Sequence, residues 1–359
     1  MSKLPMVVVG MSGGVDSSVA TALLVKQGYQ VVGVMLQLWS EPGREGSNRC
    51  CTPDSMAQAR RVAAGLGIPF YAIDVKDIFH KEVVEMFTAG YARGITPNPC
   101  LECNHNIRWG FLLDRARAMG AEYFATGHYA RLRKLPDGKV QLLEGIDSNK
   151  DQSYVLSILN QEQLTHTILP LGDLYKPEVR QLARDFGLAV AERAESQDLC
   201  FLGGVNYRLF LHAHAPEVAL PGLIVNRSGA VLGQHEGLAF YTTGQRKGLG
   251  ICSAEPLYVI EKNLIENKLI FGTRSELGLS GLAARCANWV SEKPEENPFR
   301  AQVKIRYKAP KAWGTITSMP GDRFSVEFDQ PLRDITPGQS AVMYQDEVCL
   351  GCGIIEEAL

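Results

Sequence analysis

Residues 10–18, with the sequence GMSGGVDSS, constrain the fold of this chain more than any other stretch. They follow an apolar run at 6–9, which predicts a buried strand, and precede a run at 19–27 whose apolar residues recur at helical spacing. The glycines therefore lie in a strand-to-helix turn, where Gly13 and Gly14 let a ligand approach the main chain. The free N–H groups at the helix start and the nearby serines favour a phosphate there.

The turn is not a Walker A loop, because the Gly-Lys-Ser/Thr ending is missing. An ordinary Gly-Ser turn is the structural alternative. The order of strand, glycines, acidic Asp16, hydroxyl groups and helix favours a phosphate-binding turn over that alternative.

Length and composition limit the number of domains, the possible partners and the cellular compartment of the protein. With 359 residues, 45% of them hydrophobic, the chain can form two or three packed domains. Lys and Arg number 37 against 39 Asp and Glu, so an RNA partner must be held by local basic patches rather than by net charge. Nine cysteines, no apolar leader and no run of transmembrane length predict a cytoplasmic protein without membrane contact, whose thiols are catalytic, metal-binding or buried.

Alternating strand and helix patterns over the first 205 residues predict an α/β domain with a parallel sheet. Such sheets bind ligands beyond the carboxyl ends of their strands, where the glycine turn lies. A hairpin is expected at 131–143. The expected strands are 6–9, 31–38, 69–75 and 123–126, and the expected helices are 53–67, 77–91, 106–119, 152–159 and 177–186.

After residue 205, short β segments separated by Gly, Asn and Ser turns predict a small mixed or β central domain and then a C-terminal β-barrel. We place the domains at 1–205, 206–281 and 282–359. Within the barrel, Lys304, Arg306, Lys308 and Lys311 are predicted to form one basic strand, with Tyr307 and Trp313 interleaved. The alternative for these cations is a solvated sheet edge.

Two CxxC pairs occur, Cys100 with Cys103 and Cys349 with Cys352. A shared zinc site would need both pairs, but strand alternation predicts opposite faces for the second pair, which argues against zinc. Cys103 is expected just before a helix that opens near residue 104, close to Arg108, and both features would lower the pKa of its thiol.

The other cysteines carry weaker signals. Cys200 stands alone at the end of a loop, and an isolated cysteine is more often a buried small hydrophobe than a nucleophile. The same interpretation applies to Cys50, Cys51, Cys252 and Cys286.

Eight motifs follow one another along the chain: GMSGGVDSS, PNPCLECN, ATGHYA, KDQSYVL, SQDLCF, YTTGQRKGLG, KIRYK and PGQSAVMY. From residue 6 to about 354 this combination resembles the bacterial tRNA-specific 2-thiouridylases of the ATP-pyrophosphatase superfamily. The glycine turn alone marks only the superfamily, whereas the cysteine motifs with KDQSY are more specific. The resemblance implies a tRNA-uridine 2-sulfurtransferase, which adenylates the C2 oxygen of the wobble uridine and installs sulfur from a cysteine persulfide.

The resemblance also implies residue roles. Cys200 matches the cysteine that carries the persulfide, Cys103 the cysteine that resolves it through a transient disulfide, and Asp16 the acid of the Mg²⁺–pyrophosphate site. The implied ATP contacts are Gly10, Met11, Ser12, Gly13, Gly14, Val15, Asp16, Ser17, Leu36 and Gly127. The implied tRNA contacts are Asn98, Pro99 and Cys100 at the target base, and His128, Lys150, Asp151, Gln152, Arg306, Tyr307 and Gln339.

ATP and Mg²⁺ are the implied cofactors, and we assign no metal ligands beyond Asp16. The implied partners are the tRNAs for Lys, Glu and Gln, and a sulfur donor that is either a cysteine desulfurase or a relay protein. Cys100 stands where many relatives carry an acid, so the general-base role proposed for that acid is not carried over. An iron–sulfur cluster on Cys100, Cys103 and Cys200 is a less favoured alternative.

Two other function classes compete with this interpretation. One is a different ATP-pyrophosphatase enzyme that acts on RNA or on a small molecule. The other is a non-catalytic RNA-binding or redox protein, which leaves the glycine turn and Cys200 without a role. Formation of 2-thiouridine and pyrophosphate from tRNA, ATP and a sulfur donor separates the three.

Overall fold

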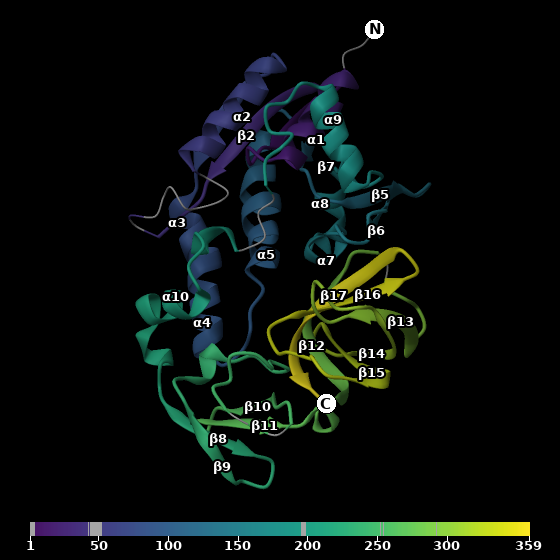
Figure 1. Ribbon diagram of the computed structural model, residues 1–359. Helices are drawn as coiled ribbons and strands as arrows, with labels where there is room; N and C mark the ends of the chain where they lie inside the picture. Colours follow the sequence, from purple (N-terminus) through teal and green to yellow (C-terminus); the bar gives the residue numbers. More distant parts are fainter. Residues whose placement is uncertain are drawn as a thin grey trace.

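A computed structural model describes residues 4–41, 43, 52–194, 199–251, 253, 255–291 and 293–359. Cys50, Cys51, Cys252 and the residues 196–198 of the SQDLCF motif lie outside these ranges. The described chain builds three sheets (Figure 1): a five-stranded sheet near the N-terminus, a four-stranded sheet from the middle of the sequence, which lies at the bottom of the view, and an eight-stranded sheet that includes the C-terminal strands. No helix in the described ranges is long and apolar enough to span a membrane.

The N-terminal sheet is parallel, with the strand order β3-β2-β1-β4-β7, which confirms the predicted α/β fold. The order reverses between β1 and β4, and the crevice at such a reversal is the usual ligand site of an open parallel sheet. The strands are β1 Met6–Gly10, β2 Gln30–Gln37, β3 Phe70–Asp74, β4 Tyr123–Ala125 and β7 Thr167–Ile168.

Helices cover both faces of this sheet. Residues of α1 Val15–Lys26, α2 Pro53–Gly65 and α9 Lys176–Asp185 share one apolar cluster with β1 and β2. The opposite face packs against Trp109, Leu112 and Leu113. The remaining helices here are the run α3 Lys76–Phe79, a π-helical segment His80–Glu85 and α4 Met86–Ala92, followed by α7 Ser153–Leu156 and α8 Gln161–Thr165.

The helix expected at 106–119 begins seven residues earlier than predicted. It runs without a break through α5 Pro99–Glu102, a π-helical segment Cys103–Leu112 and α6 Leu113–Ala118. The Asn98 side chain accepts hydrogen bonds from the N–H groups of Cys100 and Leu101, and Pro99 occupies the first helical position. Two residues that look like loop formers are therefore the helix start, a role for which Asn and Pro are both well suited.

The central part has a mixed sheet with the order β10-β11-β8-β9, as predicted. The β8–β11 pair is parallel, whereas β8–β9 and β10–β11 are antiparallel. A helix, α10 Tyr207–His214, precedes the sheet, in a stretch for which no helix was listed among the expected elements. The strands are β8 Gly222–Asn226, β9 Val231–His235, β10 Tyr258–Asn263 and β11 Lys268–Gly272.

The C-terminal strands form the predicted barrel. They follow the order β12-β15-β14-β13-β16-β17, and a β12–β17 pairing closes the ring. The predicted hairpin, β5 Ala130–Lys134 with β6 Val140–Glu144, extends this sheet by pairing β6 with β17, which attaches the barrel to the α/β part. The barrel strands are β12 Leu279–Trp289, β13 Phe299–Lys304, β14 Ala312–Met319, β15 Arg323–Leu332, β16 Ser340–Gln345 and β17 Val348–Ala358.

The prediction of one basic strand is wrong. Strand β13 ends at Lys304, and Arg306, Lys308 and Lys311 lie in the connection to β14, where the Ala309 N–H bonds back to the Arg306 carbonyl. Two of these cations pair with carboxylates of the α/β part. Lys311 Nζ lies 2.8 Å from Glu144, and Lys304 Nζ lies 3.8 Å from Asp151.

The expected alternation of Cys349 and Cys352 is also wrong. The pairing of β16 with β17 shifts register between Met343 and Tyr344, so that Leu350 is an extra residue in β17. This bulge turns both cysteines into the same apolar cluster, where each is fully buried. Burial raises the pKa of the Cys352 thiol to about 11 and that of Cys349 as well, so both stay protonated, packed side chains at neutral pH.

Candidate active site

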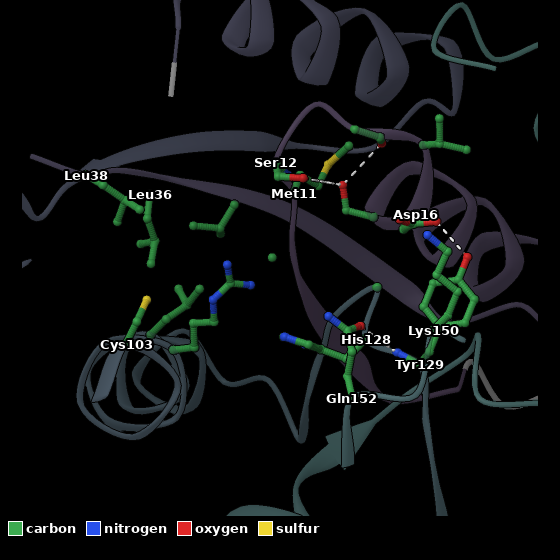
Figure 2. Close-up of a pocket in the computed structure, with 18 of the residues that line it drawn as sticks. Met11, Ser12, Asp16, Leu36, Leu38, Cys103, His128, Tyr129, Lys150 and Gln152 are labelled. Carbon is green, nitrogen blue, oxygen red and sulfur yellow. Dashed lines mark hydrogen bonds between the residues drawn. The ribbon is translucent and has the colours of Figure 1, made fainter. Parts of the chain in front are cut away.

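A pocket of about 390 Å³ lies beyond the carboxyl ends of β1 and β4 (Figure 2), at the reversal of strand order. Its volume falls in the usual range for small-molecule sites. The predicted site residues that line it are Gly10, Met11, Ser12, Gly14, Val15, Asp16, Ser17, Leu36, Cys103, Gly127, His128, Lys150, Gln152 and Tyr307.

Gly13 differs from the other residues of the glycine turn in its position and its backbone conformation. It is not among the residues that line the pocket, and its φ of 70° places it in the left-handed region. A Cβ at this position would lie 2.2 Å from the Ser55 carbonyl oxygen, so a side chain would collide with the backbone at the start of α2. Gly14 is extended, with φ −93°, so the conformational freedom expected of both glycines is needed only at Gly13.

Gly127 brings two backbone segments together at the mouth of the turn. A Cβ on Gly127 would lie 2.7 Å from the backbone carbon of Asp16 and from the nitrogen of Ser17. The main chain after β4 therefore touches the first turn of α1, where N–H groups lack helical partners. A phosphate bound here meets main-chain donors that side chains do not cover.

The charge of the pocket is strongly unbalanced. Among the described residues that line it, Asp16 is the one carboxylate, whereas the cations number four: Arg108, Lys150, Lys176 and Arg193. Lys176 Nζ lies 2.5 Å from Asp16 Oδ1, and the Tyr129 hydroxyl donates to the same oxygen at 2.7 Å. A pocket of this composition suits a polyanion, and one carboxylate beside phosphates is a common arrangement for Mg²⁺.

Sequence reasoning missed Tyr129, Lys176 and Arg193. Arg193 donates to the Gly13 carbonyl oxygen at 2.8 Å and to Ser55 Oγ at 2.8 Å, which joins the turn to α2. Lys176 and Arg193 follow Asp16 by more than 150 residues and belong to no motif, so no local signal identifies them. Tyr129 lies inside the ATGHYA motif, so its position in a motif could have identified it as a site residue.

Two side chains that line the pocket, His128 and Tyr307, have strongly shifted pKa values. Burial, and then the positive charge of Arg108, lower the pKa of His128 to about 3, so its imidazole is neutral at physiological pH. The His128 Nδ1 lies 2.7 Å from the Thr126 hydroxyl. Burial, with the nearby Asp151 and Cys100, raises the pKa of Tyr307 to about 12 and keeps its phenol protonated.

Cys103 lines the pocket, and Figure 2 shows its sulfur directed toward Leu36 and Leu38, across from Asp16 and Tyr129. Because the helix begins at Pro99, Cys103 lies a full turn inside it, and the expected position at a helix N-terminus is wrong. The predicted cation is present, since Arg108 lines the same pocket.

Cys200 does not line the pocket with Cys103. It begins the short 3₁₀ turn Cys200–Leu202, is partly buried, and packs against the same apolar cluster that contains Cys103. The described cysteines are all free, so Cys103 and Cys200 are not joined by a disulfide in this structure. Within the described ranges no three His, Cys, Asp or Glu side chains are grouped so that they could hold a metal ion.

Comparison with known proteins identifies the family. Family models match three parts of the chain: a tRNA methyl transferase HUP domain at residues 5–204, a tRNA methyl transferase PRC-barrel domain at 208–273, and an aminomethyltransferase beta-barrel domain at 279–355. A tRNA-specific 2-thiouridylase MnmA from Moorella thermoacetica is 47% identical over 97% of this chain and 98% of its own length. Another from Geobacter metallireducens is 45% identical over 98% and 97%.

This chain belongs to the tRNA-specific 2-thiouridylase family. Among solved structures, a 4-thiouridine synthetase–RNA complex with bound ATP aligns at 19% identity and a TM-score of 0.37, over 59% of this chain and 51% of that one.

The family's expected tRNA contacts separate into two groups. His128, Lys150, Gln152 and Tyr307 line the pocket, as stated above. The ATGHYA and KDQSYVL motifs are joined directly, because Tyr129 N–H donates to Gln152 Oε1 at 3.0 Å and Gln152 N–H to the Tyr129 carbonyl at 2.8 Å. This contact places two motifs that are separated in sequence on the same wall of the pocket.

The second group lies outside the pocket. Asn98 caps α5, Pro99 is buried beside it, and Cys100 is exposed on the same turn. Gln339 of the barrel donates to the Thr96 carbonyl at 2.8 Å, which holds the approach to that turn. Arg306 lines a different pocket.

Asp151 differs most from its expected role as a tRNA contact. It is buried, and its carboxylate accepts hydrogen bonds from the N–H groups of Gly145 and Ser153 at 3.0 Å each and from Ser153 Oγ at 2.9 Å. These bonds direct the carboxylate into the protein, so it shapes the loop that presents Lys150 and Gln152.

Proposed function

We propose that this protein is an ATP-dependent tRNA-uridine 2-sulfurtransferase that exchanges the C2 oxygen of the wobble uridine for sulfur. The observation that carries the proposal is that one pocket joins the glycine turn to the thiol of Cys103. The names of relatives aligned over nearly the whole chain support the same reaction.

The glycine turn and the cations are assigned to ATP. The N–H groups at the start of α1 and the side chains of Lys176 and Arg193 hold the phosphates, while Leu36 and Gly127 contact the remainder of the nucleotide. Asp16 offers a carboxylate to Mg²⁺, held in place by Lys176 and Tyr129. When bound, Mg²⁺ neutralises charge on the phosphates and assists departure of pyrophosphate.

The two cysteines are assigned to sulfur transfer. The terminal persulfide sulfur of Cys200 bonds to C2 of the adenylated uridine, and AMP leaves with the former C2 oxygen. The Cys103 thiolate then attacks the Cys200 sulfur, the S–S bond breaks, and the outer sulfur stays on the base. The transferred sulfur gains two electrons, the cysteines lose two as a Cys103–Cys200 disulfide, and a thiol reductant restores them.

The wall formed by His128, Lys150, Gln152 and Tyr307 is assigned to the target nucleotide, with Asn98, Pro99 and Cys100 beside the base. A modifying enzyme must take its base out of the anticodon stack, and stacking with edge hydrogen bonds holds it there. The tRNAs for Lys, Glu and Gln are the proposed substrates, and a cysteine desulfurase or relay protein the proposed donor. A cytoplasmic setting keeps the thiols reduced.

The direct test incubates the protein with unmodified tRNA, ATP, Mg²⁺ and a persulfide donor, followed by mass analysis of nucleosides and measurement of pyrophosphate. We expect 2-thiouridine with the wild type and none with Cys200→Ser. The exposed Cys286 of the barrel provides the matched control, and Cys286→Ser should retain full thiolation. Thiolation that persists in Cys200→Ser would contradict the persulfide assignment.

The same assay, repeated with a methyl donor added, examines methyl transfer, which the description of the matched HUP domain names. A methylated nucleoside and a thiolated one differ in mass, so one analysis distinguishes them. A methylated product formed without ATP consumption would overturn the proposed reaction.

A further inference from the structure

A second pocket of about 480 Å³ lies where the three parts of the chain meet. Tyr91 of α4 contributes one wall, Tyr207 and Arg208 of α10 another, and the turn 242–247 a third. Arg306 and Asp334 come from the barrel part. The turn belongs to the YTTGQRKGLG motif, and no residue at 242–247 has a role in the proposed reaction.

Positive charge dominates this pocket. Arg208, Lys247 and Arg306 line it, against the single carboxylate of Asp334 among the described residues. Lys247 is exposed and forms no ion pair with any residue that the structure describes. Arg306 Nε is buried and has no hydrogen-bond partner among those residues. A buried N–H without a partner is costly, so this donor favours a ligand that accepts a hydrogen bond.

The turn that carries Lys247 is held in a defined shape. The Thr242 N–H donates to Gln245 Oε1 at 3.1 Å, and Gln245 Nε2 donates to the Lys247 carbonyl at 3.0 Å. Arg306 donates to the Thr243 carbonyl at 2.9 Å, which fastens the turn to the barrel. The pocket is therefore formed before a ligand arrives, which limits the entropy lost on binding.

Two consecutive residues of the chain line the two different pockets. Tyr307 lines the pocket of the glycine turn, and Arg306 lines the second pocket. Consecutive Cα atoms lie about 3.8 Å apart, so the backbone that lines one pocket continues directly into the backbone that lines the other. A free small anion would gain nothing from this arrangement, whereas a polynucleotide would gain a second contact from it.

We propose that the second pocket binds a backbone phosphate of the RNA strand within two nucleotides of the target uridine. The proposal rests on the proposed function, because it takes the target base to lie in the first pocket. Lys247, Arg208 and the Nε–H of Arg306 provide the charge and the hydrogen bond that a phosphate diester accepts. The contact is independent of sequence and fixes how the strand enters.

The turn itself supplies a matched pair of variants. Arg246 and Lys247 are adjacent, exposed and equally charged, but the described residues that line the pocket include Lys247 and not Arg246. Binding of an anticodon stem-loop is measured as a function of salt. We expect Lys247→Ala to weaken binding about fivefold and to lower the salt slope by about 0.7, whereas Arg246→Ala changes neither. Equal effects of the two variants would show diffuse surface charge and overturn the proposal.

A second measurement uses RNA with one neutral methylphosphonate at each position within two nucleotides of the uridine. At one position we expect a fivefold loss with the wild type and no further loss in Lys247→Ala, since the contact is already missing. Additive losses at every position would overturn the proposal. Wild-type protein that binds the stem-loop but forms no 2-thiouridine would instead contradict the proposed function, so the two failures are distinguishable.

Discussion

Asp16 receives two donors from residues far along the chain, Tyr129 and Lys176. At the residue scale we predict that Lys176→Met lowers ATP-dependent pyrophosphate release about a hundredfold or more, because a preorganised cation at the phosphates is lost. The control is Lys81→Met at an exposed lysine outside the pocket, which should remain within twofold. Normal pyrophosphate release by Lys176→Met would show that this lysine does not act in the ATP site.

The close approach at Gly127 predicts opposite effects for two Gly→Ala changes. Gly127→Ala places a methyl group 2.7 Å from backbone atoms of Asp16 and Ser17, and such overpacking costs about 1–3 kcal/mol. We expect a lower melting temperature and loss of ATP binding. Gly65→Ala adds a methyl group to α2 with no atom within 4 Å, and should stabilise by about 0.5–1 kcal/mol. Equal melting temperatures of the two variants would contradict the contact.

The pKa of His128 predicts a dependence of stability on pH. Folding lowers this pKa from 6.5 to about 3, so in this window the unfolded chain binds more protons than the folded one. Stability is therefore complete above pH 6.5 and falls on acidification, by up to about 1.4 kcal/mol per pH unit.

Urea unfolding at pH 7.5, 6 and 5 checks this dependence. The stability difference between wild type and His128→Gln should shrink as the pH falls, because the variant has no imidazole to protonate. A difference between wild type and His128→Gln that stays constant with pH would show that His128 is not the group responsible.

Which site residues could be predicted depended on sequence distance. The glycine turn was predictable because strand, turn and helix are contiguous and their order is informative. The partners of Asp16 were not, because a lone lysine such as Lys176 has no local feature that links it to a turn 160 residues earlier. Cys200 was assigned only through the resemblance, and the structure leaves it outside the pocket.

At the scale of elements, Asn98 caps α5 and is also proposed to lie beside the target base. Asn98→Ala should destabilise the protein by about 1 kcal/mol, because two backbone N–H groups at the helix start lose their acceptor. Asn98→Asp keeps the acceptor and should restore stability while changing the polar group offered to the base. Melting temperature and thiolation rate are measured for both. Equal thiolation by Asn98→Asp and wild type would restrict Asn98 to its structural role.

Elements were predicted well where hydrophobic periodicity was uninterrupted, as in the parallel strands and the closed barrel. Two errors share one cause, namely that tertiary contacts decided the local structure. The bulge at Leu350 follows the neighbouring strand, and Arg306 lies outside the strand and bonds to the central turn. The helix start at Asn98 and Pro99 was missed although its capping signal is local.

On the scale of the whole molecule, the barrel is attached to the α/β part at several points. Strand β17 pairs with β6, Gln339 bonds to the Thr96 carbonyl, and the Tyr154 hydroxyl donates to the Ser340 carbonyl at 2.9 Å. Tyr307, in the connection between β13 and β14, lines the same pocket as the glycine turn. The sulfur of Cys200 must still reach the pocket, and a disulfide with Cys103 requires the two Cα atoms within about 7 Å.

The central claim is that one pocket couples ATP cleavage to sulfur transfer from Cys200 to tRNA, with Cys103 as the resolving thiol. The most direct measurement is a single turnover of protein loaded with a ³⁵S-labelled persulfide, mixed with ATP, Mg²⁺ and unmodified tRNA. We predict equal amounts of labelled 2-thiouridine, AMP and Cys103–Cys200 disulfide, the last identified by peptide mass. Labelled tRNA formed with no disulfide, or formed equally by Cys200→Ser, would contradict the account.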